Sequence, residues 1–168
     1  MTPVRWGIAA AAAALAADQA SKALLLYGFG FYDMFPGEHV QVLPFFDLVM
    51  VWNRGISYGL FQSQGLWGTL LLTLFSVVAI AALGWWLTRA ERIFPAFGLG
   101  LVIGGAIGNV IDRIIYGAVA DFFHFHAFGR DWYVFNVADA AITIGVIALL
   151  ADAFVRPGGE TRKPGVEP

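Results

Sequence analysis

The chain has 168 residues, of which 59% are hydrophobic and only 13% are charged, and its mean hydropathy is +0.71. This composition is more apolar than that of soluble domains, and at this length it predicts a membrane protein of one domain. The formal net charge of -2 gives no electrostatic basis for binding nucleic acid, and the absence of cysteine excludes disulfides, thiolate nucleophiles and Cys-ligated metals.

Four stretches of the chain approach the roughly 20 apolar residues that a helix needs to cross a bilayer core. We place these predicted membrane spans near residues 4–27, 66–88, 95–116 and 135–155.

The first predicted span has an alternative interpretation. Arg5 followed by an alanine-rich run is also typical of a cleavable secretory signal peptide. The apolar pattern resumes after Lys22, which favours a span that tolerates Asp18 and Lys22 near one end. These two residues are four apart and therefore share a helix face.

The segment between the first two spans is rich in β-branched and aromatic residues and is interrupted by Pro44, Gly55 and Gly59. This pattern predicts strands and turns. We expect a small β element at residues 40–61, resting on the outer face of the membrane.

The second and third spans differ in character. The second carries no charge and has Trp67 at one end and Trp85 and Trp86 at the other, as in an interfacial aromatic belt. The third contains Gly100, Gly104 and Gly108 at a spacing of four residues, which favours close helix packing over a ligand-binding loop.

The remaining segments surround the fourth span. We expect an extracytoplasmic loop at residues 117–134. The tail at residues 156–168 is composed of Pro, Gly and charged residues, which predicts disorder.

Positive charge near the membrane predicts the orientation. With four spans, six of the ten Lys and Arg residues fall on the side of the two termini, which are then cytoplasmic: Arg5, Arg89, Arg92, Arg156, Arg162 and Lys163. The other four fall on the outer side: Lys22, Arg54, Arg113 and Arg130.

Ionisable groups inside membrane helices cost about 2.5 to 3.5 kcal/mol each at the helix centre, so their presence suggests a function. In this chain a set of polar residues falls at the outward-facing ends of the spans: Asp18, Lys22, Asn109, Asp112, Arg113, Asn136 and Asp139. Asp121 follows the third span, so a loop could bring it to Asp139. Two close carboxylates tend to share a proton, which is the arrangement of aspartic proteases.

Less specific interpretations remain open for these residues. The pairs Asp18 and Lys22, or Asp112 and Arg113, also fit interfacial groups that anchor helix ends. Asp139 by itself fits a charge at a helix N-terminus.

Two other functions are alternatives. A metal-dependent intramembrane hydrolase would use His124, His126, Asp121 and Asp139, although these residues lack the spacing of a known metalloprotease motif. A proton-linked transporter subunit would use a relay of five residues: Asp18, Lys22, Asp112, Arg113 and Asp139. A relay needs ionisable groups across the whole bilayer, whereas the cytoplasmic halves of the last three spans offer only Asp152.

Four motifs together resemble those of one family. The motifs are DQASK at 18–22, WNRGISYG at 52–59, GGAIGNVIDRIIYGAVADFF at 104–123 and FNVADAAI at 135–142. Their order, spacing and membrane context resemble the lipoprotein signal peptidase family, also called signal peptidase II, over the chain up to about residue 155.

This resemblance implies an aspartic endopeptidase of the bacterial inner membrane that works as a monomer without a cofactor or a metal. Its substrates would be prolipoproteins, cut just before a cysteine that carries a diacylglyceryl group, and its surroundings would be membrane lipids rather than nucleic acid. The implied fold is an all-α membrane protein, a bundle of four transmembrane helices with a small extracytoplasmic β cradle and a surface loop or helix. Residues 40–61 and 122–133 match those last two parts.

The resemblance also assigns residues. The catalytic pair would be Asp121 and Asp139. The supporting residues would be Asp18, Lys22, Asn53, Arg54, Gly55, Asn109, Asp112, Arg113, Asn136 and Ala138.

The chain departs from the family pattern at Ile56, Ser57 and Tyr58, and at Ala120, where Val is commoner. These departures leave the polar groups in place and bear on the shape of the substrate groove. We expect Asp139, near a helix N-terminus, to be the ionised member of the pair and Asp121 to hold the proton.

Overall fold

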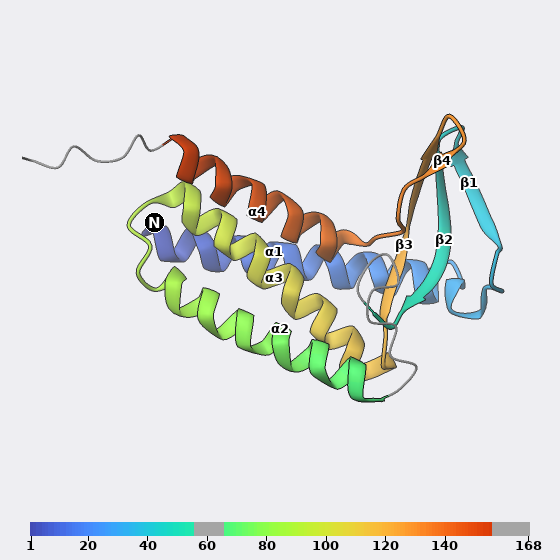
Figure 1. Ribbon diagram of the computed structural model, residues 1–168, viewed down its shortest axis with the longest axis horizontal. Helices are drawn as coiled ribbons and strands as arrows, with labels where there is room; N and C mark the ends of the chain where they lie inside the picture. Colours follow the sequence, from blue (N-terminus) through green and yellow to red (C-terminus); the bar gives the residue numbers. More distant parts are fainter. Residues whose placement is uncertain (56–65, 156–168) are drawn as a thin grey trace, which may run out of the picture.

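The computed structural model describes residues 1–55 and 66–155. A bundle of helices forms one part of the molecule, and a small antiparallel sheet stands at one end of the bundle (Figure 1). The end of the expected β element at 56–61, with Ile56, Ser57 and Tyr58, lies outside the described residues, as does the tail at 156–168.

The bundle consists of four apolar helices, each long enough to cross a membrane. They are α1 (Pro3–Ala23), α2 (Leu66–Leu87), α3 (Ile93–Tyr116) and α4 (Val137–Val155). A π-helical turn at Leu24–Gly28 extends the first candidate span to Pro3–Gly28. The four helices closely match the predicted spans.

Helix α3 is the central element because it packs against α1, α2 and α4. Small residues permit this close packing. A Cβ added at Gly100 would meet the backbone of Gly7, and one at Gly104 would meet the backbone of Ala11, both in α1. The packing role predicted for these two glycines is therefore supported.

The sheet has the order β1-β2-β3-β4, with every neighbouring pair antiparallel. Its strands are β1 (His39–Leu43), β2 (Phe46–Asn53), β3 (Val119–Ala127) and β4 (Arg130–Asp131). The first two strands confirm the β element expected after the first span, as far as it is described.

The prediction of a loop at 117–134 is corrected by the structure, because most of this segment forms β3 and β4. The sequence alone gave a weak signal here, since Asp121, His124 and His126 interrupt the apolar run. What stabilises β3 is pairing with β2, a partner that lies about 70 residues earlier, as in the pairs Leu48↔Phe123 and Val51↔Asp121.

The sheet is fixed to the bundle by a small apolar core. Leu25, Leu26 and Phe31, which follow α1, pack against Ala120 and Phe122 of β3. This contact holds β3 at one end of the helices. The N-terminus and the turn between α2 and α3 lie at the opposite end (Figure 1).

Candidate active site

Asp121 lies just beyond the end of α3. The helix ends at Gly117, which has a left-handed backbone (φ 71°) and donates its N–H to the carbonyl oxygen of Arg113 (3.1 Å). Glycine adopts this conformation without strain, so the chain turns sharply there into β3. The Asp121 residue is 1% exposed.

The end of β2 supplies a donor to Asp121. Nδ2 of Asn53 donates to Oδ2 of Asp121 (3.0 Å), and Oδ1 of Asn53 accepts the N–H of Gly55 (3.0 Å). Because an amide has one acceptor end and one donor end, the contact with Gly55 aims the donor end at Asp121. Arg54 lies between these two residues and is exposed.

Asp139 lies in the first turn of α4 and takes part in a capping box. Oδ1 of Asn136 accepts the N–H of Asp139 (2.9 Å), and Oδ2 of Asp139 accepts the N–H of Asn136 (3.3 Å). These reciprocal bonds satisfy two backbone donors at the start of the helix. They also fix the Asp139 carboxylate at a helix N-terminus, where the helix dipole favours an anion.

Asn136 joins the two aspartates. Its Nδ2 lies 2.7 Å from Oδ1 of Asp121 and 3.3 Å from both Oδ1 of Asn109 and the carbonyl oxygen of Ala120. Nδ2 of Asn109 in turn donates to Oδ1 of Asp139 (2.9 Å). Asn136 is fully buried. Asp121 and Asp139 are thus linked through Asn136, and Asn109 bridges Asn136 and the Asp139 carboxylate.

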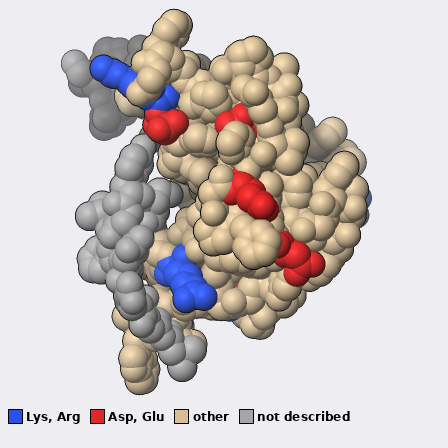
Figure 2. Space-filling model, turned by 90° about the vertical axis from the view of Figure 1, so that its right-hand side faces the viewer, with Lys and Arg blue, Asp and Glu red and all other residues tan. Residues whose placement is uncertain are grey.

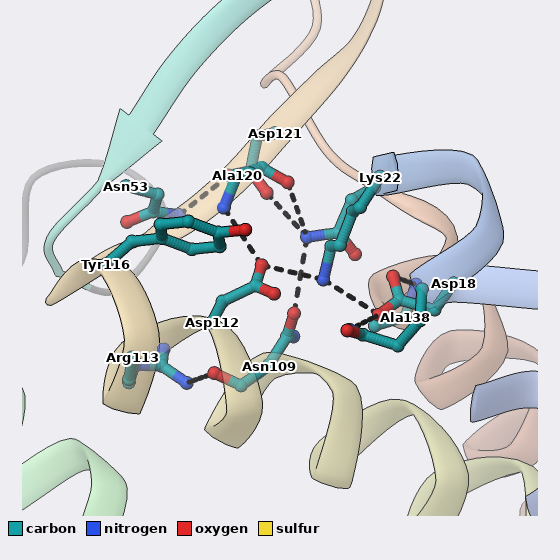
Figure 3. Close-up of polar contacts among 12 residues, drawn as sticks. Asp18, Lys22, Asn53, Asn109, Asp112, Arg113, Tyr116, Ala120, Asp121 and Ala138 are labelled. Carbon is teal, nitrogen blue, oxygen red and sulfur yellow. Dashed lines mark hydrogen bonds and ion pairs between the residues drawn. The ribbon is translucent and has the colours of Figure 1, made fainter. Parts of the chain in front are cut away.

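Lys22, Asp18 and Asp112 form a buried ion-pair cluster close to Asp121 (Figure 3). Nζ of Lys22 lies 2.8 Å from Oδ2 of Asp18 and 2.8 Å from Oδ2 of Asp112. All three residues are at most 3% exposed. The interpretation of Asp18 and Lys22 as interfacial anchors does not hold, since neither side chain reaches solvent. Asp112 pairs with Lys22 rather than with its neighbour Arg113.

Each carboxylate of this cluster also binds the backbone. Oδ1 of Asp18 accepts the N–H of Ala138 (3.0 Å), and Oδ2 of Asp112 accepts the N–H of Ala120 (3.1 Å). From outside, the sheet end is largely uncharged, with a few separate acidic and basic side chains (Figure 2).

Arg113 contributes a second positive charge. It is half-buried, and its Nη1 donates to the carbonyl oxygen of Asn109 (3.4 Å). It is close enough to interact electrostatically with Asp139, Asp121 and Asp112.

The surroundings of Asp121 favour its protonated form. Burial, and to a smaller extent the charge of Asp139, raise the pKa of Asp121 to about 7. The hydrogen bonds from Asn53 and Asn136 and the charge of Lys22 act in the opposite direction. At neutral pH the site is therefore able to hold a proton on Asp121.

The histidines of β3 are not part of this group. Because side chains alternate along a strand, His124 and His126 project from the face opposite to Asp121. Nε2 of His124 lies 3.5 Å from Asp131, and Nε2 of His126 lies 3.1 Å from Asp47. Within residues 1–55 and 66–155, no three His, Asp or Glu side chains are grouped so that they could hold a metal ion. The geometry thus gives no support to the metal-dependent alternative.

The relay alternative also lacks support from the helices. Helix α2 contains no ionisable residue, and α4 contains none between Asp139 and Asp152. A chain of proton carriers across the described bundle is therefore not formed.

Three contributors were not recognised from the sequence pattern. Gln19 donates from Nε2 to Oδ2 of Asp18 (3.0 Å). The backbone of Ala120 binds Asp112, a contact that no side-chain pattern reveals. Gly108, expected only to pack helices, faces the Asp18 carboxylate, which a Cβ at this position would meet. The glycine spacing was visible, but its charged neighbour was not.

The fold and the site define a class: a multi-pass membrane protein with two linked aspartates at one end of its helical bundle. Residues 10–155 match the family described as signal peptidase (SPase) II. The chain is 54% identical over 159 residues to a protein of Rhodopseudomonas palustris named lipoprotein signal peptidase, covering 92% of this chain and 95% of the relative. It is 53% identical over 160 residues to a protein of the same name from Nitrobacter hamburgensis, covering 93% and 96%.

Solved structures agree with this assignment. A bacterial membrane enzyme determined by the in meso method at 2.3 Å resolution superposes with a TM-score of 0.78 at 25% identity, covering 95% of this chain and 93% of that one. A second such structure, at 1.9 Å resolution, gives a TM-score of 0.75 at 26% identity, covering 90% and 94%. The chain belongs to the signal peptidase II family and is a protease.

Proposed function

We propose that this protease is an aspartic endopeptidase whose catalytic pair is Asp121 and Asp139. Its substrates are prolipoproteins, and the bond cut precedes a cysteine that carries a diacylglyceryl group. The observation that carries this proposal is the Asn136 side chain, which donates from Nδ2 to the Asp121 carboxylate and accepts the backbone N–H of Asp139 through Oδ1. The Asp139 carboxylate in turn accepts the backbone N–H of Asn136. These bonds support two carboxyl groups that act on a single water molecule and a single carbonyl.

The first step uses the two carboxyl groups in different protonation states. Asp139 is ionised and takes a proton from water while the water oxygen attacks the carbonyl carbon of the scissile bond. Asp121 gives its proton to the carbonyl oxygen, so that a neutral tetrahedral diol forms. The raised pKa of Asp121, about 7, supports this role as the acid.

The second step breaks the C–N bond. Asp139, now protonated, gives its proton to the leaving nitrogen, and Asp121 takes a proton from one hydroxyl of the diol. The products are the carboxyl end of the signal peptide and the free amine of the lipidated cysteine, and both aspartates return to their starting states. Arg113 lies near enough to stabilise negative charge that develops on the oxygens.

The proposal includes a place and an orientation. The acyl chains of the substrate remain in a bilayer, so the pair belongs at a membrane surface where water reaches the carbonyl. We place it at the outer face of the bacterial inner membrane, with both termini in the cytoplasm. The N-terminus and the turn between α2 and α3 lie at the end of the bundle opposite to the sheet (Figure 1). These segments carry Arg5, Arg89 and Arg92, which supports this orientation. The protein acts as a monomer among membrane lipids and needs no cofactor.

The test is cleavage of a diacylglyceryl prolipoprotein by the purified protein in the presence of a chelator. Asp121→Asn and Asp139→Asn should each lower kcat by more than about 10³-fold, because each removes one partner of a proton transfer. The wild-type rate should fall as the pH rises through about 7, where Asp121 loses its proton.

Asp47→Asn is a matched control. This carboxylate also belongs to the sheet but pairs with His126, so kcat should stay within about threefold of wild type. Full activity in either catalytic variant would refute the proposed pair. Loss of wild-type activity in chelator, restored by a divalent metal, would favour metal chemistry instead.

A further inference from the structure

We propose that Lys22, together with Asp18 and Asp112, is a positioning group that sets the distance between the two catalytic carboxyl groups. The inference rests on the proposed catalytic pair. In this proposal the three residues influence the rate of cleavage although none of them contacts the attacking water or the substrate peptide.

Asp18 holds the start of α4. Asp18 accepts the N–H of Ala138, the residue immediately before Asp139. A backbone bond to the preceding residue fixes where the Cα of Asp139 lies, whatever rotamer its side chain adopts. Asp18 thereby ties the start of α4 to α1.

Asp112 holds the start of β3 in the same way. Asp112 accepts the N–H of Ala120, the residue immediately before Asp121. It ties the first residues of β3 to α3. The two catalytic residues are thus held in the same way, each by a buried carboxylate on the backbone one residue upstream.

Lys22 connects the two halves. Its Nζ lies at the same distance, 2.8 Å, from Oδ2 of both carboxylates, and all three groups are buried. A buried carboxylate that loses its cation is strongly destabilised. Asp18 and Asp112 therefore cannot move away from Lys22 independently of each other. The two carboxylates that flank this ammonium group therefore join α1 and α3 to the backbones of α4 and β3 (Figure 3).

The packing of α3 is compatible with this arrangement. Gly108 leaves room for the Asp18 carboxylate between α1 and α3, since a Cβ there would meet Oδ2 of Asp18. Gln19 donates to the same oxygen and satisfies it further.

Lys22 also acts on Asp121 through its charge. The charged groups that act on Asp121 are Asp139 of α4, Arg113 of α3 and Lys22 of α1. Asp112 of α3 binds the N–H of the preceding residue, Ala120. Lys22 lowers the pKa of Asp121, so its removal raises that pKa. If Asp121 is the acid, it then keeps its proton to higher pH, and the alkaline limb of the rate profile moves upward.

The experiment compares Lys22→Met, Asp112→Asn and the double variant in the prolipoprotein assay. Lys22→Met should lower kcat by about 100-fold or more, leave KM within about threefold, and move the alkaline limb to higher pH. Asp112→Asn should lower kcat by about tenfold or more in the wild-type background. In the Lys22→Met background the same change should cost at most about threefold, because the cluster is already broken.

The control is Asp152→Asn, which removes a buried carboxylate paired with Arg92 at the other end of the bundle. It should lower the unfolding temperature in detergent without changing KM or the pH profile. If Lys22→Met is not recovered folded, Asp112→Asn, which keeps the side-chain shape, is decisive by itself.

A folded Lys22→Met or Asp112→Asn protein with wild-type kcat and pH profile would overturn the inference. The inference would also be overturned if the losses of kcat in Lys22→Met and Asp112→Asn multiplied in the double variant. The parallel measurement of Asp121→Asn separates this failure from failure of the proposed function: an inactive Asp121→Asn beside a fully active Lys22→Met sinks only the positioning role.

Discussion

The two ends of the helical bundle each contain a buried carboxylate paired with a cation, but the pairs do different work. Opposite to the sheet, Arg92 lies 2.7 Å from Asp152, and the Arg92 side chain is 48% exposed. That pair joins the start of α3 to the end of α4. At the sheet end, Lys22 is buried between two carboxylates, each of which also binds backbone.

The burial of the cation separates the two pairs. A partly solvated pair is screened by water and contributes little beyond tying two helices together. A fully buried cluster costs desolvation and therefore must satisfy every polar atom, which forces a fixed geometry on its neighbours. Here the neighbours are the segments that carry Asp121 and Asp139.

We expect the largest loss of activity from a substitution of Asn136, at the sheet end of the bundle. Asn136→Ala should lower kcat by about 10² to 10³-fold, because it removes both the donor to Asp121 and the acceptor that caps Asp139. The measurement is kcat in the prolipoprotein assay. Asn53→Ala, which removes a donor to Asp121 alone, should cost only about tenfold. Equal effects in the two variants would contradict a special linking role for Asn136.

Substitutions of two glycines, one beside the ion-pair cluster and one away from it, should differ by an intermediate effect on kcat. A Cβ at Gly108 would meet the carboxylate of Asp18, whereas a Cβ at Gly84 of α2 has nothing within 4 Å. Gly108→Ala should therefore displace Asp18 and lower kcat by about tenfold, with a loss of stability of about 1 to 3 kcal/mol. Gly84→Ala should keep wild-type kcat and stability. The prediction is wrong if both variants cleave at the wild-type rate.

The smallest expected effect is on the pH dependence of the free energy of unfolding. The pKa of Asp121 is raised to about 7 by burial, so the folded chain holds a proton that the unfolded chain loses near pH 4. Stability from this group is full below about pH 4 and is lost as the pH rises to about 7. Asp121→Asn should remove this loss, which is on the order of 1 kcal/mol.

Thermal unfolding in detergent at pH 5 and pH 8 measures this difference. The wild type should lose a few degrees more than Asp121→Asn between the two pH values. Asp152→Asn, changed at the opposite end of the bundle, should keep the wild-type difference. An unchanged difference in Asp121→Asn would show that the site end is not the source of the pH dependence.

Much of this arrangement was accessible from local sequence. The helices follow from uninterrupted apolar length, which is a property of each segment by itself. The capping box at Asn136 and Asp139 is also local, because residues three apart at a helix start face each other. Even the common depth of the polar residues follows from where each lies in its own span.

Other features depended on partners far away in the chain. Strand β3 was expected as loop because its pairing with β2 crosses about 70 residues and two helices. Lys22 and Asp112 were each assigned a nearby partner, Asp18 and Arg113, since spacing within a helix is all that a local pattern reveals.

The four helices, the common depth of the polar residues and the candidate chemical groups are predictable from local sequence, because hydrophobic length and helix periodicity are properties of each segment. Which charges pair, and which backbone groups they bind, depends on contacts between segments that are far apart in the chain. Lys22 joins Asp112, not only its own helix neighbour, because the glycines of α3 bring α1 close enough for one buried ammonium to satisfy two carboxylates.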